Sequence, residues 1–163
     1  SFSAIQNNDK IGIIFFSDVI EKFIPPKKGR SHILRIIREL IEFKPEHNKT
    51  NISEALRYMA NVIKKKCICF VISDFRDSKF EDALKLANKK HDVVALQIYD
   101  KRETELPDLG LLELQDAESG NRLIVDTSDA KVRALYKRNW EMNDKKLKEV
   151  FAKEIILKFL GHK

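Results

Sequence analysis

A chain of 163 residues can bury one hydrophobic core, and we expect a single domain over residues 1–163. With 43% hydrophobic residues its composition is globular, and no run reaches the ~18 apolar residues of a membrane span. We therefore expect a cytoplasmic protein with no membrane contact in this segment. The formal net charge of +6 raises the alternative of nucleic-acid binding. The basic clusters at residues 64–66 and 89–90 fall at predicted helix ends, where cations complement the helix dipole, so this alternative ranks last.

The chain begins with the pattern of a helix end. Phe2, Ala4 and Ile5 have helical spacing, and the polar residues that follow are typical of a closing turn. We therefore expect residues 1–8 to be the end of a truncated helix whose earlier turns precede Ser1.

Continuous apolar runs predict the strands of a buried sheet. Residues 11–16, 67–73 and 92–99 are rich in β-forming side chains and are expected to be buried on both faces. Residues 19–24 alternate between apolar and polar and predict a hairpin partner for the first run. The prolines at 25–26 are typical of an edge strand.

Three helices are expected from their capping residues. Ser31 precedes an apolar stripe at helical spacing, and Asn51 with Glu54 fits a capping box. Ser78 with Glu81 fits another capping box. Each of the last two helices connects one apolar strand to the next, which is the pattern of parallel α/β sheets.

The last third of the chain has a different sequence pattern. Residues 111–115 and 122–126 predict a β-hairpin around a glycine-containing turn. A long C-terminal helix is expected over residues 128–160. We predict an α/β fold: a doubly wound, mostly parallel open sheet with helices on both faces, and this β-hairpin before the last helix.

Asp74 is the strongest candidate for a functional side chain, because it ends an apolar strand where open α/β sheets bind ligands. Its alternative role is structural, as a cap for amides near Asp77. Thr50 precedes the helix that leads into this strand, and a helix N-cap is its alternative role. Together, a hydroxyl and a carboxylate suit a hard cation. No phosphate loop, nucleophile elbow or zinc-ligand spacing is present in the sequence, so we expect no catalytic residues and no enzyme.

Several spaced segments resemble one known family. Residues 8–18, 23–30, 49–56, 71–75 and 123–129 are similar, in order, to the von Willebrand factor A-like domain of the MoxR-associated domain-of-unknown-function 58 family. The resemblance implies a doubly wound α/β domain that here lacks its N-terminal first strand.

The same resemblance implies a metal-ion-dependent adhesion site. Such a site combines an Asp-x-Ser-x-Ser loop, a threonine and an aspartate. Thr50 matches the threonine and Asp74 matches the aspartate, whereas the loop has no counterpart and Lys49 replaces the usual glycine. The complete protein is expected to use Mg²⁺ or another divalent cation. Because magnesium requires near-octahedral oxygen coordination, these two ligands alone predict no tightly held metal in this chain.

The absent first strand would be the neighbour of both the 11–16 and the 67–73 strands. We expect either that these two strands close up or that a partner strand fills the gap, with a homo-oligomer as one form of the second outcome.

The function implied by the resemblance is a protein–protein interaction module. It would bind a MoxR-type AAA+ ATPase in chaperone-like complex maturation, and an acidic side chain of that partner would complete the cation's coordination. One alternative is an Asp-based phospho-receiver or enzyme of α/β fold that uses Asp74, although further acids near the first strand are not seen. The other is a basic nucleic-acid-binding domain, although its basic clusters lack interleaved aromatic residues.

Overall fold

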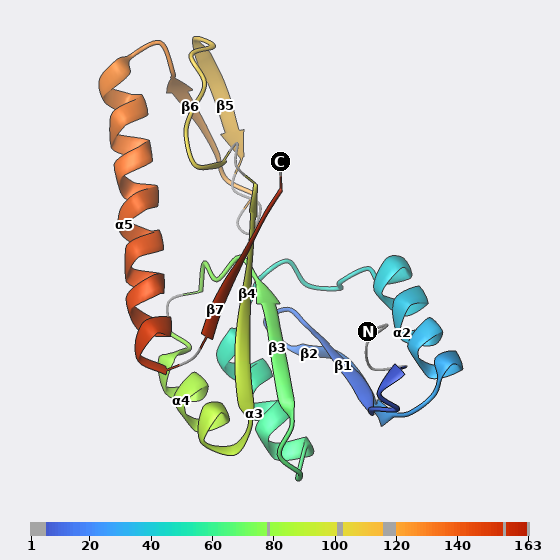
Figure 1. Cartoon of the computed structure of the whole chain (residues 1–163). Helices are drawn as coiled ribbons and strands as arrows, with labels where there is room; N and C mark the ends of the chain where they lie inside the picture. The colour runs from blue at the N-terminus through green and yellow to red at the C-terminus, as the bar shows by residue number, and fades with distance from the viewer. Residues whose placement is uncertain (1–5, 78, 101–102, 116–119, 155, 163) are drawn as a thin grey trace.

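The computed structural model describes residues 6–77, 79–100, 103–115, 120–154 and 156–162, with side chains described as far as Ala152 (Figure 1). The elements in chain order are β1 (Ile11–Phe16), β2 (Ile20–Lys27), α2 (Arg30–Glu42), α3 (Ile52–Val62), β3 (Ile68–Ser73), α4 (Glu81–Lys90), β4 (Asp92–Asp100), β5 (Leu111–Gln115), β6 (Arg122–Asp126), α5 (Ala130–Glu154) and β7 (Ile156–His162). Of the helix end expected over residues 1–8, residues 1–5 lie outside the described residues.

The described strands form separate small sheets rather than the one open sheet expected. β3, β4 and β7 are parallel, with β4 in the middle. β1 and β2 form an antiparallel hairpin, and β5 and β6 form a second one, as the sequence predicts. No described strand is hydrogen-bonded between β1 and β3, so these two strands do not close up. The fold is mixed α/β, and a continuous doubly wound sheet is not formed by this part of the chain.

The main hydrophobic core lies between α3, α4 and α5 and one face of β3 and β4. Ile14 and Phe16 of β1 pack against this core, which joins the first hairpin to the rest of the fold. The buried members of the core are Ile52, Leu56, Met59, Val71, Phe75, Phe80, Ala83, Leu84, Ala87, Val93, Ala95, Leu147 and Phe151.

The helix α2 covers the other side of the first hairpin. Ile36 of α2 packs with Phe15 of β1 and Ile24 of β2 in a second buried cluster. β1 therefore has packed side chains on both of its faces, as a continuous apolar run predicts.

The expectation of burial on both faces is wrong for β3. Ile68, Phe70 and Ile72 are 64%, 59% and 53% exposed, whereas Val71 between them is buried. The reason is positional: α3, α4 and α5 contribute to the core on the Val71 side, while α2 packs on the β1–β2 hairpin. One face of the three-stranded sheet is thus left uncovered by the described helices.

The helix starts agree with the sequence in one case and differ in another. The Asn51 side chain accepts a hydrogen bond from the Glu54 N–H at 3.0 Å and caps α3, as the capping box predicts. α2 begins after Gly29, which has a φ of 102°, so Ser31 lies inside the helix rather than at its cap. α4 begins at Glu81 after Phe80. The expected cap Ser78 lies outside the described residues.

The C-terminal helix is shorter than expected. α5 ends at Glu154, and residues 156–162 form β7 rather than continuing the helix to residue 160. β7 pairs in parallel with β4, from Val94 opposite Ile156 to Asp100 opposite His162. An apolar run of this length is compatible with a strand as well as with a helix, and hydrogen bonding to the free edge of β4 favours the strand.

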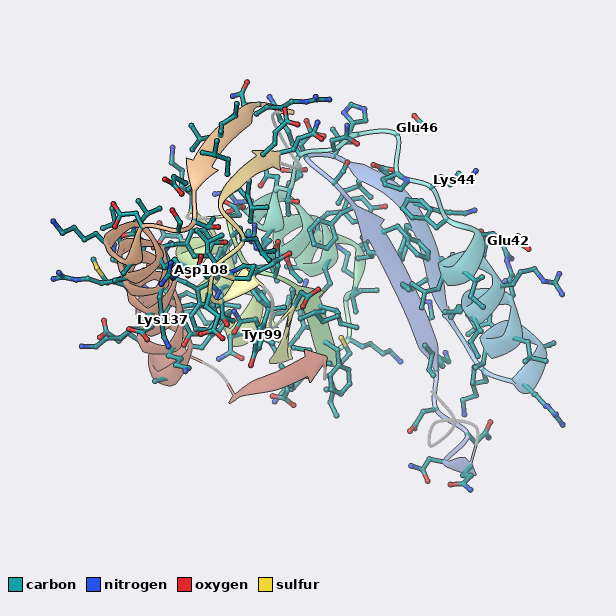
Figure 2. All side chains as sticks on the ribbon, turned by 90° about the horizontal axis from the view of Figure 1, so that it is seen from above. Glu42, Lys44, Glu46, Tyr99, Asp108 and Lys137 are labelled. Atoms are coloured by element: carbon teal, nitrogen blue, oxygen red, sulfur yellow. The ribbon has the colours of Figure 1, made fainter. Side chains whose placement is uncertain are left out.

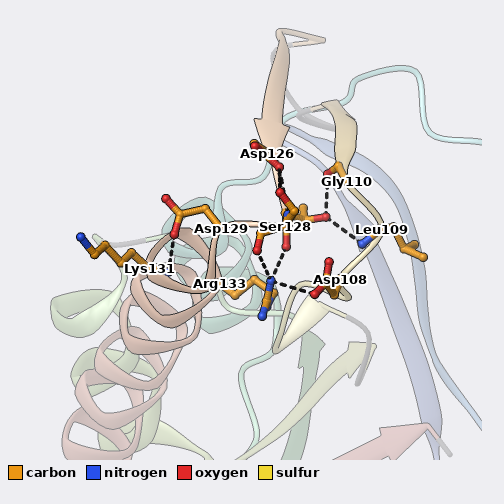
Figure 3. A network of polar contacts seen from close by, with 9 residues as sticks. Asp108, Leu109, Gly110, Asp126, Ser128, Asp129, Lys131 and Arg133 are labelled. Carbon is orange, nitrogen blue, oxygen red and sulfur yellow. Dashed lines mark hydrogen bonds and ion pairs between the residues drawn. The ribbon is translucent and has the colours of Figure 1, made fainter.

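A polar network fixes the β5–β6 hairpin to the start of α5 (Figure 3). The Thr127 hydroxyl donates to the Gly110 carbonyl at 2.7 Å and accepts from the Leu109 N–H at 3.0 Å. The Arg133 guanidinium donates to the Thr127 carbonyl at 2.6 Å and lies 3.3 Å from the Asp108 carboxylate. Thr127 is fully buried, and these hydrogen bonds satisfy its polar groups within the protein.

Candidate binding site at the carboxyl ends of β1 and β3

The first turn of α3 holds together the loops that follow β1 and β3. The Asn51 N–H donates to the Ser17 carbonyl at 2.8 Å, and the Ile52 N–H donates to the Asp77 carboxylate at 3.0 Å. Because Asn51 and Ile52 are consecutive, these two acceptor atoms lie within ~10 Å of each other. The loops that follow the two strands therefore meet at one helix N-terminus.

Phe75 anchors the loop that follows β3. Its ring is 6% exposed, with its centroid 5.0 Å from that of Phe151 and 5.8 Å from that of Phe80. Its φ of 57° lies in the left-handed region, which is unusual for a bulky side chain. The buried ring turns the backbone so that Asp74 and Arg76, on either side of it, are exposed. Strained backbone of this kind is often found at functional sites.

Asp74 has a charged partner of its own. The Arg76 Nε lies 3.4 Å from one Asp74 carboxylate oxygen, and the Arg76 backbone N–H donates to the other at 3.4 Å. The Arg76 guanidinium also contacts the Glu103 carboxylate, and the Tyr136 hydroxyl donates to the Glu103 carbonyl at 3.1 Å. These groups are exposed, so each ion pair contributes at most ~1 kcal/mol.

Thr50 lies at the same end of the fold as Asp74. It directly precedes Asn51, and the amides that follow it are bound by Ser17 and by Asp77 of the loop that carries Asp74. The alternative cap role falls to other residues, because Asn51 and Asp77 bind the first amides of α3. The role of Thr50 and Asp74 as metal ligands stays a prediction.

The oxygen atoms of Thr50 and Asp74 are of the type that binds a cation, but they are too few to hold one. A hydroxyl and a carboxylate are hard oxygen ligands. However, among the described residues no group of three or more His, Cys, Asp or Glu side chains is placed to hold a metal ion. Asp77 already accepts from the Ile52 and Lys79 amides, and Asp74 is paired with Arg76. A cation at Asp74 would need further oxygen ligands and would have to displace the guanidinium.

Sequence reasoning missed Asp77 and Arg76. Asp77 accepts a hydrogen bond from the Ile52 amide in the first turn of α3, across 25 positions of sequence, and Arg76 is the counter-ion of Asp74. A weak signal for Asp77 exists, since acids are common beside helix N-termini, but no sequence signal identifies which helix it caps.

A second candidate is a surface cavity of about 600 Å³ between β2 and the end of α2. Figure 2 shows Glu42, Lys44 and Glu46, which line it, along the end of α2 and the connection that follows. Glu21, another lining residue, accepts from the Glu46 N–H at 2.9 Å. The Ser17 hydroxyl, followed by backbone N–H groups, holds the pKa of Glu21 below its usual value. The Glu21 carboxylate therefore holds the connection between α2 and α3 in place.

The fold and the loops described above define a mixed α/β domain with an exposed carboxylate at its strand ends. Over residues 1–146 the chain matches the family described as protein of unknown function DUF58, and it belongs to this family. Uncharacterised proteins of Mycobacterium tuberculosis and Mycobacterium bovis are 26% identical over 115 residues. The match covers 69% of this chain, and the chain spans about a third of the length of those relatives, 36%.

Two solved structures have a similar fold. The conserved hypothetical protein BatB from Bacteroides thetaiotaomicron has a TM-score of 0.56 at 17% identity, and the match covers 99% of this chain and 77% of that one. An aerotolerance-related membrane protein from Bacteroides fragilis has a TM-score of 0.51 at 19% identity, covering 90% and 80%. No helix in the described part of the chain combines the length and apolar character that a membrane crossing requires. The DUF58 resemblance is confirmed, whereas the von Willebrand factor A-like site and the MoxR association stay predictions.

Proposed function

We propose that this chain is a cytoplasmic protein-interaction module whose contact surface is the pair of loops carrying Thr50 and Asp74. The observation that carries the proposal is the turn at Phe75, which uses a buried ring to present an exposed carboxylate at a strand end. Loops held by a rigid core are common places for binding residues. The core side chains around Phe75 supply that rigidity.

The partner we propose is a MoxR-type AAA+ ATPase, in a chaperone-like maturation role. In the complete protein, Mg²⁺ or another divalent cation would be held by Thr50, Asp74 and oxygen ligands from outside residues 1–163. Such a cation supplies positive charge for an acidic group of the partner. We propose binding rather than catalysis, because the described partners of Asp74 are a guanidinium, a backbone amide and the Ser73 hydroxyl.

The test is binding of the ATPase to the complete protein carrying Asp74→Asn or Thr50→Val. We expect either change to weaken binding at least tenfold, ~1.4 kcal/mol. Asp92→Asn is the matched control: this exposed carboxylate pairs with Lys66 at the opposite ends of the strands, 2.8 Å away. Binding that is unchanged by the two site variants, or equally weakened by the control, would refute the proposal.

Metal dependence is tested separately. Titration calorimetry of residues 1–163 with Mg²⁺ should show no micromolar binding, because the described ligands are too few. Micromolar affinity in this chain would contradict the expectation that the site is incomplete.

A further inference from the structure

The β5–β6 hairpin stands apart from the rest of the fold. Figures 1 and 2 show it projecting beyond the three-stranded sheet, near the start of α5. Among the described strands β6 pairs only with β5, so its other edge is open. Each of its five side chains except Val125 is exposed, and Leu123 and Ile124 are 64% and 70% exposed. A two-stranded hairpin is only marginally stable by itself, so added strands would stabilise it.

The backbone of β6 has hydrogen-bonding groups along this open edge. The Thr127 N–H donates to the Gly110 carbonyl at 2.7 Å, which continues the register of β5 and β6 by one residue. Hydrogen-bonded and non-hydrogen-bonded pairs alternate along an antiparallel ladder. The N–H and C=O groups of Arg122, Ile124 and Asp126 therefore point away from β5, toward the open edge.

The sequence of β6 is complementary to itself when two copies run antiparallel. The strand reads Arg-Leu-Ile-Val-Asp. In a pair centred on Ile124, Arg122 of each copy lies opposite Asp126 of the other, and the three apolar residues between them face apolar residues. Opposite charges and apolar side chains that lie directly opposite each other stabilise antiparallel strands. The same register also brings the outward backbone groups of the two copies together.

The two charged residues are available for this contact. Ser128 donates from its N–H and from its hydroxyl to Asp126 Oδ1, at 2.9 and 2.6 Å, so Asp126 Oδ2 can accept from another residue. These hydrogen bonds hold the pKa of Asp126 below its usual value, so this carboxylate is charged at neutral pH. The Arg122 Nη1 lies 3.3 Å from the Glu113 carboxylate in an exposed pair, and the other guanidinium N–H groups can donate to a second carboxylate.

The other edge of the hairpin is less suitable for the same contact. β5 reads Leu-Leu-Glu-Leu-Gln, so the same centring would place Glu113 opposite Glu113 of the other copy. Like charges directly opposite each other destabilise a pair of strands. Of the two edges of this hairpin, β6 therefore favours self-association.

We propose that two copies of this chain pair through β6, antiparallel and centred on Ile124, so that their two hairpins form one four-stranded sheet. The contact is isologous, because the same strand of each copy forms both halves of it. Two strands of five residues make a contact at the small end of specific interfaces, so the pair dissociates on dilution. This inference does not depend on whether Asp74 binds a partner.

Sedimentation velocity of the complete protein over a range of concentrations tests the pairing. Arg122→Glu faces Asp126 of the other copy with a like charge, and Asp126→Arg faces Arg122 with a like charge. We expect each variant alone to dimerise at least ~10-fold more weakly than the unaltered protein, because two attractive pairs become repulsive.

Mixing the two variants separates pairing from misfolding. In a mixed dimer of Arg122→Glu with Asp126→Arg, opposite charges face each other at both ends of the contact, so we expect an equal mixture to recover dimerisation. A mixture that dimerises no better than either variant alone would overturn the proposal. Unaltered protein that stays monomeric up to ~1 mM would overturn it as well.

A second pair of variants tests the centre of the contact. Ile124→Lys faces Glu113 across its own hairpin, so the hairpin is retained, but it places two like charges opposite each other where the copies meet. We expect at least ~10-fold weaker dimerisation. Ile41→Lys is the matched control, since Ile41 is 78% exposed in α2, outside the hairpin. Equal dimerisation of these two variants would refute pairing through β6.

Discussion

Replacing Phe75 by glycine and by alanine tests the account of the β3–α4 loop. Removing the buried ring costs ~3–5 kcal/mol in either variant. At a φ of 57°, alanine also retains a left-handed strain of ~1–2 kcal/mol that glycine avoids. Glycine lowers the stability by ~0.4–1 kcal/mol relative to alanine, because its unfolded chain has more conformational freedom. We therefore expect Phe75→Gly to be more stable than Phe75→Ala by ~0.5–1 kcal/mol.

Urea denaturation measures this difference, with a slope of ~2 kcal/mol per molar for a domain of this size. The Phe75→Ala midpoint should fall by ~2 M, and the Phe75→Gly midpoint by ~0.3–0.5 M less. The same two substitutions at Leu86, a half-exposed residue inside α4, are the control and should follow the opposite order, because glycine costs ~1 kcal/mol in a helix. Alanine more stable than glycine at both positions would refute the left-handed turn.

Three further predictions concern polar groups. Asp77→Ala should lower the stability by ~1 kcal/mol in thermal denaturation, because the Ile52 amide loses its cap, and Asp77→Asn should retain most of it. Ser128→Ala should raise the pKa of Asp126 in an NMR titration, because hydrogen bonds from Ser128 hold that pKa low. The stability that these hydrogen bonds provide is present above the pKa of Asp126 in the unfolded chain and is lost as the pH falls. Burial raises the pKa of Cys69 to about 11, so native Cys69 should resist iodoacetamide at pH 8, and stability should fall as pH rises above the ordinary thiol pKa.

Local features of this fold could be predicted from the sequence. The capping box at Asn51 and the two hairpins depend on residues close together in the chain, where spacing carries the information. The placement of Asp74 at the end of a strand depends on the same kind of signal.

Features that depend on distant segments could not be predicted. The exposure of Phe70 depends on which face the helices cover, and an apolar run does not specify that. The strand β7 exists as a partner of β4, some 60 residues earlier, and its sequence is compatible with a helix as well. Around the candidate site, Arg76 is only two residues from Asp74, whereas its second partner, Glu103, is 27 residues from it.

The prolines of β2 bear on how this chain associates at high concentration. Pro25 and Pro26 have no N–H to donate, so the edge of β2 is a poor template for an added strand. The edge of β3, in contrast, presents free donors and acceptors. Of these two edges, β3 rather than β2 is therefore where we expect further pairing of copies of this chain at high concentration.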